Sequence, residues 1–180
     1  MAERKGYKRK THEHRKDLGG EHKLSDTGQI ILLVFFITGI LADKFILHCS
    51  VFSIQFFPFY LRALISLPFF VFSFFLARFG LKIIFGEQRE EMVVIRSGVF
   101  SIVRHPIYLG SILVYFGFII ISLSIIAFYI WVIIILFYYY ISRYEEKILI
   151  DKIGAQYEEY VREVPMFIPR FRKKRDDSLL

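Results

Sequence analysis

The chain has 180 residues, of which 55% are apolar, and 21 of them are phenylalanine. A soluble domain of this length has too much surface for its volume to keep that apolar fraction from water, and the apolar residues here lie in blocks between charged segments. The net charge of +7 does not indicate nucleic-acid binding, because the basic residues lie in tails and loops beside the apolar blocks. With one cysteine, Cys49, the sequence excludes an intramolecular disulfide and a thiolate-rich zinc site.

The N-terminal segment, residues 1–28, is polar and rich in Lys, Arg and His. Such a composition buries too little apolar surface to fold, so we predict a disordered basic tail on the cytoplasmic side of a membrane. The histidines of this tail have no further ligand residues around them, and no metal is expected to bind there.

Two apolar segments follow within residues 29–79, and each is long enough to cross a bilayer as a helix. The first covers about residues 29–47 and carries Asp43 and Lys44 near its far end. The second covers about residues 57–79 and carries Arg62 close to one edge. Arg62 is expected to extend to the membrane interface, although Asp43 is an alternative partner for it within the membrane.

Residues 107–141 form one uncharged block of 35 residues, whereas a helix needs only about 20 residues to cross a bilayer. Two helices are therefore predicted, with a tight turn at the most polar point, residues 122–124. Residues 143–162 then repeat apolar side chains at helical spacing, and Gly154 within them marks a break or a close contact. The predicted fold class is an all-α integral membrane protein with four transmembrane helices and a C-terminal cytoplasmic helix.

The distribution of basic residues supports four spans. With this count both termini and the loop at residues 80–105 lie on one side, together with 22 of the 24 Lys and Arg residues. Only Lys44 and Arg62 remain for the other side. Because cytoplasmic segments are the ones enriched in Lys and Arg, both termini are predicted to be cytoplasmic. The basic tail at residues 170–180 should attract anionic lipid headgroups there.

Two polar segments interrupt the apolar pattern at the predicted cytoplasmic edge. In the first, Pro106 suits the first turn of a helix, which places His105 at the N-cap and Tyr108 in the first turn. The positive end of the helix dipole favours an anionic group at this point. The alternative is an interfacial anchor, with Arg104 on lipid headgroups and Tyr108 in the aromatic belt.

The second polar segment, residues 143–150, contains two adjacent carboxylates, Glu145 and Glu146, just beyond the last span. Adjacent carboxylates can bind ribose hydroxyls or a cation. The alternative is ordinary solvation of a helix surface, with Glu146 free to pair with Arg143 and Lys147.

Together and in this order, the two segments resemble the isoprenylcysteine carboxyl methyltransferase family, which is related to the phospholipid methyltransferases. The resemblance covers about residues 93–169, and a methyltransferase core is expected over residues 80–169. The matching positions are Ser97-Gly98, Arg104-His105-Pro106-x-Tyr108, the uncharged hairpin, Glu145-Glu146-x-x-Leu149, Gly154-x-x-Tyr157-x-x-Tyr160 and Val164-Pro165.

The resemblance implies S-adenosyl-L-methionine as the cofactor, bound in a pocket on the cytoplasmic side. The backbone of residues 92–95 is expected beside the adenine, and the N-terminus of the third span beside the amino-acid moiety. The implied cofactor-binding residues are Met92, Val93, Val94, Ile95, Phe100, His105, Pro106, Ile107, Tyr108 and Glu145.

The resemblance also implies a lipophilic methyl acceptor that enters from the membrane, with the carboxylate of a C-terminal isoprenylcysteine as the leading candidate. The family's prenylcysteine enzymes commonly place an arginine where this chain has Ile141, so Arg143 is the candidate for neutralising the substrate. Alternatively, the acceptor is a phospholipid amine, and Glu145 or Glu146 then acts as the base.

Arg143 and Glu146 are therefore the predicted catalytic residues, and the expected partners are membrane lipids and a lipid or prenylated substrate, with neither nucleic acid nor metal. Two alternatives lie outside the methyltransferase class: a sterol-reductase-like enzyme with a nicotinamide cofactor, which generally has more spans, and a non-catalytic four-span membrane protein.

Overall fold

The computed structural model describes residues 23–50, 57–86 and 93–169, and within these ranges it contains helices and no strand. The predicted all-α class is therefore confirmed for this part of the chain. The elements are α1 (Lys23–Ala42), the π-helical turn η2 (Asp43–Leu47), α3 (Phe59–Gly86), the 3-10 turn η3 (Gly98–Ser101), α4 (Pro106–Ser122), α5 (Ile125–Ile153) and α6 (Ala155–Glu163).

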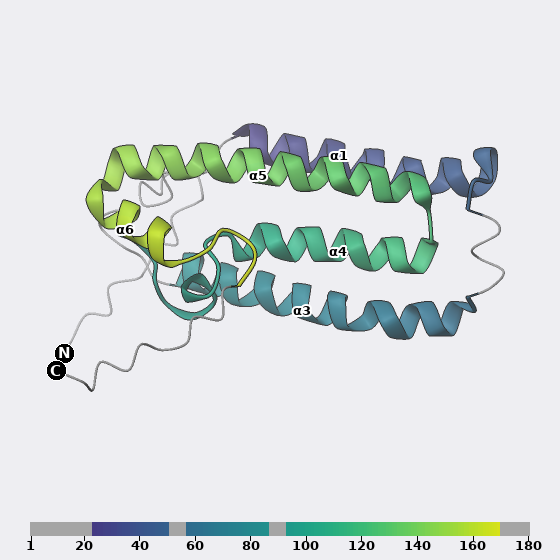
Figure 1. Ribbon diagram of the computed structural model, residues 1–180, viewed down its shortest axis with the longest axis horizontal. Helices are drawn as coiled ribbons and strands as arrows, with labels where there is room; N and C mark the ends of the chain where they lie inside the picture. Colours follow the sequence, from purple (N-terminus) through teal and green to yellow (C-terminus); the bar gives the residue numbers. More distant parts are fainter. Residues whose placement is uncertain (1–22, 51–56, 87–92, 170–180) are drawn as a thin grey trace, which may run out of the picture.

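The four long helices lie side by side in an elongated bundle, with α1 along α5 and α3 along α4 (Figure 1). The closest packing is between α3 and α4. There the Ser73 hydroxyl donates a 2.7 Å hydrogen bond to the carbonyl of Gly110. A Cβ atom at Gly110 would lie 3.3 Å from the Ser73 carbonyl oxygen, so the missing side chain permits this approach.

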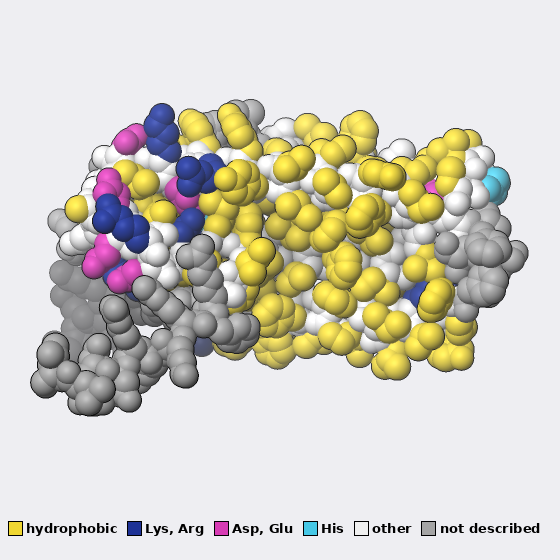
Figure 2. Space-filling view, viewed as in Figure 1, with side chains coloured by type: hydrophobic (Ala, Val, Ile, Leu, Met, Phe, Trp, Pro, Cys, Tyr) yellow, Lys and Arg dark blue, Asp and Glu magenta, His cyan; other side chains and the backbone are white. Residues whose placement is uncertain are grey.

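Within the described ranges, three helical segments are long and apolar enough to cross a membrane: Thr27–Leu47, Phe59–Ile84 and Ile125–Ile153. The fourth apolar helix, α4, has 17 residues, or about 26 Å at 1.5 Å per residue. The protein is thus an integral membrane protein with three helices of spanning length, and the count of four spans stays a prediction. Large apolar side chains cover most of the visible surface, and charged side chains gather at the end beside α6 (Figure 2).

The predicted hairpin is present. Leu123 forms the turn between α4 and α5 with φ of 52°, and Ser124 caps α5 by accepting a hydrogen bond from the Ala127 amide. The expected loop at residues 80–105 is shorter than predicted, because α3 continues to Gly86. The apolar residues at 83–85 extend its helical pattern past residue 79, where the predicted span ended.

The polar helix after the hairpin is continuous with the last span, since α5 extends to Ile153 without interruption. Gly154 then breaks the helix with φ of 76° and ψ of −143°, a backbone conformation that is almost restricted to glycine. The short α6 follows and ends at Glu163, two residues before Pro165. The fully buried core is small and lies between α1, α4 and α5: Phe36, Ile112, Tyr115, Ala127, Ile134 and Tyr138.

Candidate active site

The two polar segments of the sequence meet at the charged end of the bundle. Pro106 occupies the first turn of α4 with His105 at the N-cap, as predicted. The uninterrupted α5 carries its adjacent glutamates to the same level. The His105 Nε2 atom lies 3.1 Å from Glu146 Oε1, and the Tyr108 hydroxyl donates to Glu145 Oε1. The two polar segments therefore lie next to each other across the hairpin.

Glu146 is the centre of a buried network and is only 2% exposed. Its Oε1 atom accepts a 2.7 Å hydrogen bond from Arg104 Nε as well as the contact with His105. Its Oε2 atom lies 3.8 Å from Arg143 Nη1. Ordinary solvation of a helix surface does not describe this carboxylate, because two side chains from another element hold it inside the protein.

Arg104 connects that network to the C-terminal strap, residues 164–168. Its Nη1 atom donates to the carbonyl oxygens of Val161, at 2.6 Å, and of Val164. The amide of Arg104 donates to the Pro165 carbonyl at 2.9 Å. The arginine is 9% exposed, so the interpretation as an anchor on lipid headgroups is wrong. Two features of the sequence could have indicated this role of Arg104. It directly precedes His105-Pro106, and the facing helix carries the acidic pair Glu145-Glu146.

Glu145 and Tyr108 form the more accessible part of the cluster. The Tyr108 ring stacks on His105, with centroids 5.7 Å apart, and on Tyr138, at 5.1 Å. His105 Nδ1 lies 3.8 Å from Glu145 Oε2. Tyr108 is half-buried and stacks on two rings of the protein, which does not fit a role in an aromatic belt. Phe167 of the strap, which the sequence pattern did not assign to the site, covers His105 at 6.1 Å between ring centroids.

The protonation state of His105 follows from its surroundings. Burial lowers the pKa of this imidazole, and the positive charge of Arg104 acts in the same direction, whereas Glu146 opposes both. A neutral imidazole that donates from Nε2 to the Glu146 carboxylate carries no proton on Nδ1. The Nδ1 lone pair and the Glu145 carboxylate then form two neighbouring acceptors, which suits a bound ammonium group.

The remaining predicted cofactor residues lie around this cluster or outside the described part of the chain. Val93 is exposed, and Val94 and Ile95 are half-buried in a segment without helix. Met92 lies outside the described residues. The Phe100 carbonyl in η3 accepts a 2.7 Å hydrogen bond from the Tyr160 hydroxyl.

Two further predicted residues face a different helix. The side chains of Pro106 and Ile107 lie against Gly80 of α3, so they support the start of α4 from the side of α3.

Tyr157 and Tyr160 of α6 are buried, and burial raises the pKa of both phenols, which keeps the hydroxyls neutral.

Arg143 lies on the surface of α5, with a side chain that is 60% exposed. Ile141, at the position where an arginine was expected by resemblance, is buried in the bundle. Arg104 is the cation nearest the cluster, and its guanidinium is occupied by Glu146 and two backbone carbonyls. The site therefore contains two carboxylates and no buried cation that is available to an anionic ligand among the described residues.

Comparison with known proteins places this cluster inside a recognised family segment. A model of the phospholipid methyltransferase family matches residues 62–156. Methanethiol S-methyltransferase 2 of Bradyrhizobium diazoefficiens is 33% identical over 88 residues, which cover 44% of this chain and 30% of that relative. The match thus covers less than a third of the relative's length. No solved structure matches the chain significantly.

Proposed function

The chain belongs to the phospholipid methyltransferase family, and on this premise we propose that it transfers a methyl group from S-adenosylmethionine to a lipophilic acceptor. The observation that carries the proposal is the cluster of His105, Tyr108 and Glu145 at the end of apolar helices. At this depth a polar cofactor can reach the site from water, and a lipid acceptor can reach it from the bilayer.

The residues of the cluster fit the amino-acid part of the cofactor. The acceptor pair of His105 Nδ1 and the Glu145 carboxylate suits its ammonium group, and the positive end of the α4 dipole suits its carboxylate. The bound cofactor would supply a methyl group on a sulfonium, which needs in-line positioning and exclusion of water. Phe167 and Tyr108 supply apolar cover beside that position.

The charges of the site favour an amine as the acceptor. A carboxylate acceptor needs a neighbouring cation, but Arg104 is fully engaged and Arg143 points to the surface. Two carboxylates instead attract the ammonium headgroup of an aminophospholipid. That ammonium must lose a proton before methylation. Because Glu145 is assigned to the ammonium group of the cofactor, the candidate base is Glu146, whose Oε2 atom has no hydrogen-bond partner in the described structure.

The second candidate acceptor is the carboxylate of an isoprenylcysteine. It is supported by the position of Arg143, whose Nη1 atom lies 3.8 Å from Glu146 Oε2 and therefore within reach of the cluster. In that case Arg143 neutralises the acceptor, and no proton has to be removed.

An assay in proteoliposomes separates the two acceptors. Purified protein is given methyl-labelled cofactor with either phosphatidylethanolamine or a farnesylcysteine analogue. We expect label in the phospholipid, a loss of at least about 100-fold in Glu146→Gln, and a change within about threefold in Arg143→Gln. Label in the farnesylcysteine that is lost in Arg143→Gln would select the second candidate. Label in neither acceptor would refute a lipid methyltransferase of either kind.

A further inference from the structure

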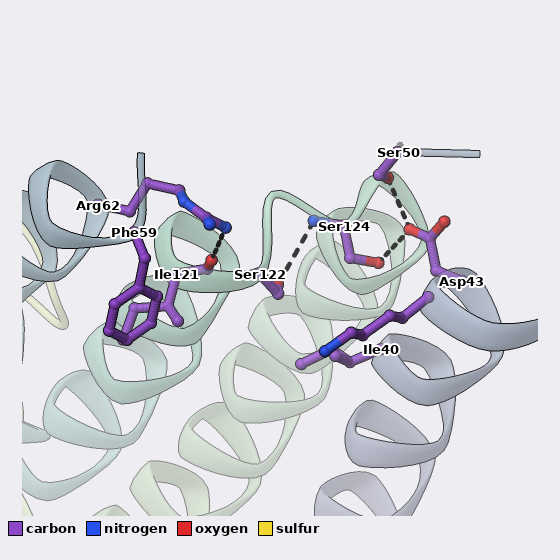
Figure 3. A pocket seen from close by; sticks show the side chains of 9 residues that line it. Ile40, Asp43, Ser50, Phe59, Arg62, Ile121, Ser122 and Ser124 are labelled. Carbon is purple, nitrogen blue, oxygen red and sulfur yellow. Dashed lines mark hydrogen bonds between the residues drawn. The ribbon is translucent and has the colours of Figure 1, made fainter. Parts of the chain in front are cut away.

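The polar residues at the end of the bundle opposite α6 serve the fold. A cavity of about 300 Å³ lies there, beside η2, the start of α3 and the turn between α4 and α5 (Figure 3). Asp43 Oδ2 accepts hydrogen bonds from the hydroxyls of Ser50, at 2.7 Å, and Ser124. Arg62 Nη1 donates to the Ile121 carbonyl, so Asp43 and Arg62 have separate partners in place of the predicted ion pair. The atoms of these two residues that have no partner, Oδ1 and Nε, are enclosed in the protein, where a ligand does not reach them.

The two tyrosines of the motif Gly154-x-x-Tyr157-x-x-Tyr160 differ in how the fold uses their hydroxyls. The Tyr160 hydroxyl donates a 2.7 Å hydrogen bond to the carbonyl of Phe100. The Tyr157 hydroxyl makes no hydrogen bond within the described ranges, although the residue is only 6% exposed. It is not one of the fully enclosed polar atoms, so it keeps some accessible surface. A phenol in a protein interior normally has a hydrogen-bond partner, and this one therefore calls for a ligand.

Tyr157 lies on the face of α6 that is turned toward the catalytic cluster. One helical turn further on, the Val161 carbonyl accepts the 2.6 Å hydrogen bond from Arg104 Nη1, and residues four apart share a helix face. The same guanidinium binds Glu146. Burial raises the pKa of Tyr157, and the negative charges of Glu146 and Glu145 act in the same direction. The unused hydroxyl is therefore a neutral group close to the two carboxylates.

We propose that the Tyr157 hydroxyl accepts an N–H hydrogen bond from the amine of the methyl acceptor, an inference that rests on the proposed function. A neutral oxygen beside two carboxylates suits an amine better than an anion. An amine that has given one proton to Glu146 has lost its charge, but it still carries N–H groups. A hydrogen bond from one of them to Tyr157 would fix the direction of the nitrogen lone pair. Tyr157 would thereby favour acceptors that still have an N–H group over fully methylated ones.

Lipid titrations of the delipidated full-length protein, followed by native mass spectrometry, test the proposal without turnover. The titrations contain S-adenosylhomocysteine, the demethylated form of the cofactor. Phosphatidylethanolamine and phosphatidylcholine have the same net charge, but only the first has N–H groups. We expect Tyr157→Phe to weaken phosphatidylethanolamine by about fivefold and to change phosphatidylcholine by less than about twofold. Equal effects on the two lipids, or no effect on either, would overturn the proposal.

Tyr160→Phe is the matched control, because it removes the same group from the same face of α6. It breaks the hydrogen bond to Phe100, so it should lower the melting temperature and leave the preference between the two lipids unchanged. Tyr157→Phe should melt at the temperature of the wild type, because its hydroxyl has no internal partner to lose. A fall as large as that in Tyr160→Phe would show such a partner and overturn the proposal. Absence of methyl transfer to phosphatidylethanolamine in the wild type would refute the proposed function alone, since the lipid titrations do not depend on turnover.

Discussion

Arg104 is the residue on which the geometry of the cluster depends most. Its side chain joins the Glu146 carboxylate to the carbonyls at the end of α6, and its amide binds the strap. A guanidinium can make these contacts at once because its donors point in several fixed directions. His105 is thereby held between the Glu146 carboxylate and the Phe167 ring. We infer that Arg104 positions the cluster without contacting a substrate.

Substitution of Arg104 measures this contribution. Arg104→Gln leaves Glu146 buried beside a neutral side chain, and loss of one member of a buried ion pair typically costs about 3–5 kcal/mol. Arg104→Lys should be intermediate, because a single ammonium cannot reach all three acceptors. Thermal unfolding in detergent gives the comparison. Arg96→Gln is the matched control: Arg96 pairs with Glu159 and Glu163 near the surface, so it should cost about 1 kcal/mol or less. An equal loss in Arg96→Gln and Arg104→Gln would contradict the positioning role.

The depressed pKa of His105 predicts a pH-dependent stability. Because the folded pKa lies below the ordinary value of 6.5, the unfolded chain binds a proton at a pH where the folded chain does not. This contribution to stability is therefore complete above about pH 6.5 and is lost as the pH falls toward the folded pKa. The melting temperature of the wild type should fall more between pH 7.5 and pH 5.5 than that of His105→Gln. Parallel pH profiles would show that His105 does not titrate differently in the folded state.

At the scale of elements, the helices follow from sequence patterns and the contacts between them do not. Local chemistry accounts for three features. The uncharged block is too long for one helix and so forms the hairpin, Gly154 breaks the helix that follows, and Pro106 starts α4. The apolar run ends at Phe79 and is followed by Gly80 and Lys82, so the sequence pattern does not predict the extension of α3 to Gly86.

The strap and the cavity lay beyond sequence reasoning for a physical reason. Their side chains meet across more than 50 residues of chain, as in the contact of Arg104 with Val161 and that of Arg62 with Ile121. Charge alone suggested the membrane interface for both arginines, whereas in the structure both donate to backbone carbonyls. The resemblance to the methyltransferase family predicted that His105, Tyr108 and Glu145 belong to the site. It did not predict that Ile107 packs against α3.

Gly154 tests whether the angle between α5 and α6 holds the strap in place. A Cβ atom at this position would meet nothing within 4 Å, so the effect of Gly154→Ala comes from the backbone alone. Its φ of 76° and ψ of −143° are strained for alanine, at a cost of about 1–3 kcal/mol. Thermal unfolding should show this loss, and methyl transfer should fall with it. Glu158→Ala on the same short helix is the control, and a similar effect of both substitutions would argue against a role for the turn.

At the scale of the whole molecule, the two ends of the bundle differ in chemistry. The end beside α6 contains most of the charged side chains of the described structure (Figure 2), and Asp43, Lys44 and Arg62 lie together at the opposite end. Enrichment of Lys and Arg on one side predicts that the α6 end faces the cytoplasm. The proposed catalytic cluster would then lie at the cytoplasmic face of the membrane.

The orientation can be measured with the native cysteine. Cys49 is exposed and follows η2, which lies at the end of the bundle opposite α6 (Figure 1). A membrane-impermeant maleimide added to intact cells should label Cys49 from outside. In a Cys49→Ser background, Gln156→Cys on α6 should react only after the cells are made permeable. Labelling of Gln156→Cys in intact cells, with Cys49 protected in the wild type, would reverse the orientation.

Cofactor binding at the cluster is the claim on which the methyltransferase assignment of these residues depends, and titration calorimetry measures it directly. S-adenosylmethionine is titrated into the purified wild type, Glu145→Gln and Arg62→Gln in the same detergent. We expect saturable binding to the wild type, an affinity about tenfold or more weaker in Glu145→Gln, and no change in Arg62→Gln at the far end of the bundle. Absence of binding to the wild type at millimolar cofactor, or full affinity in Glu145→Gln, would contradict the assignment of the cofactor site to His105, Tyr108 and Glu145.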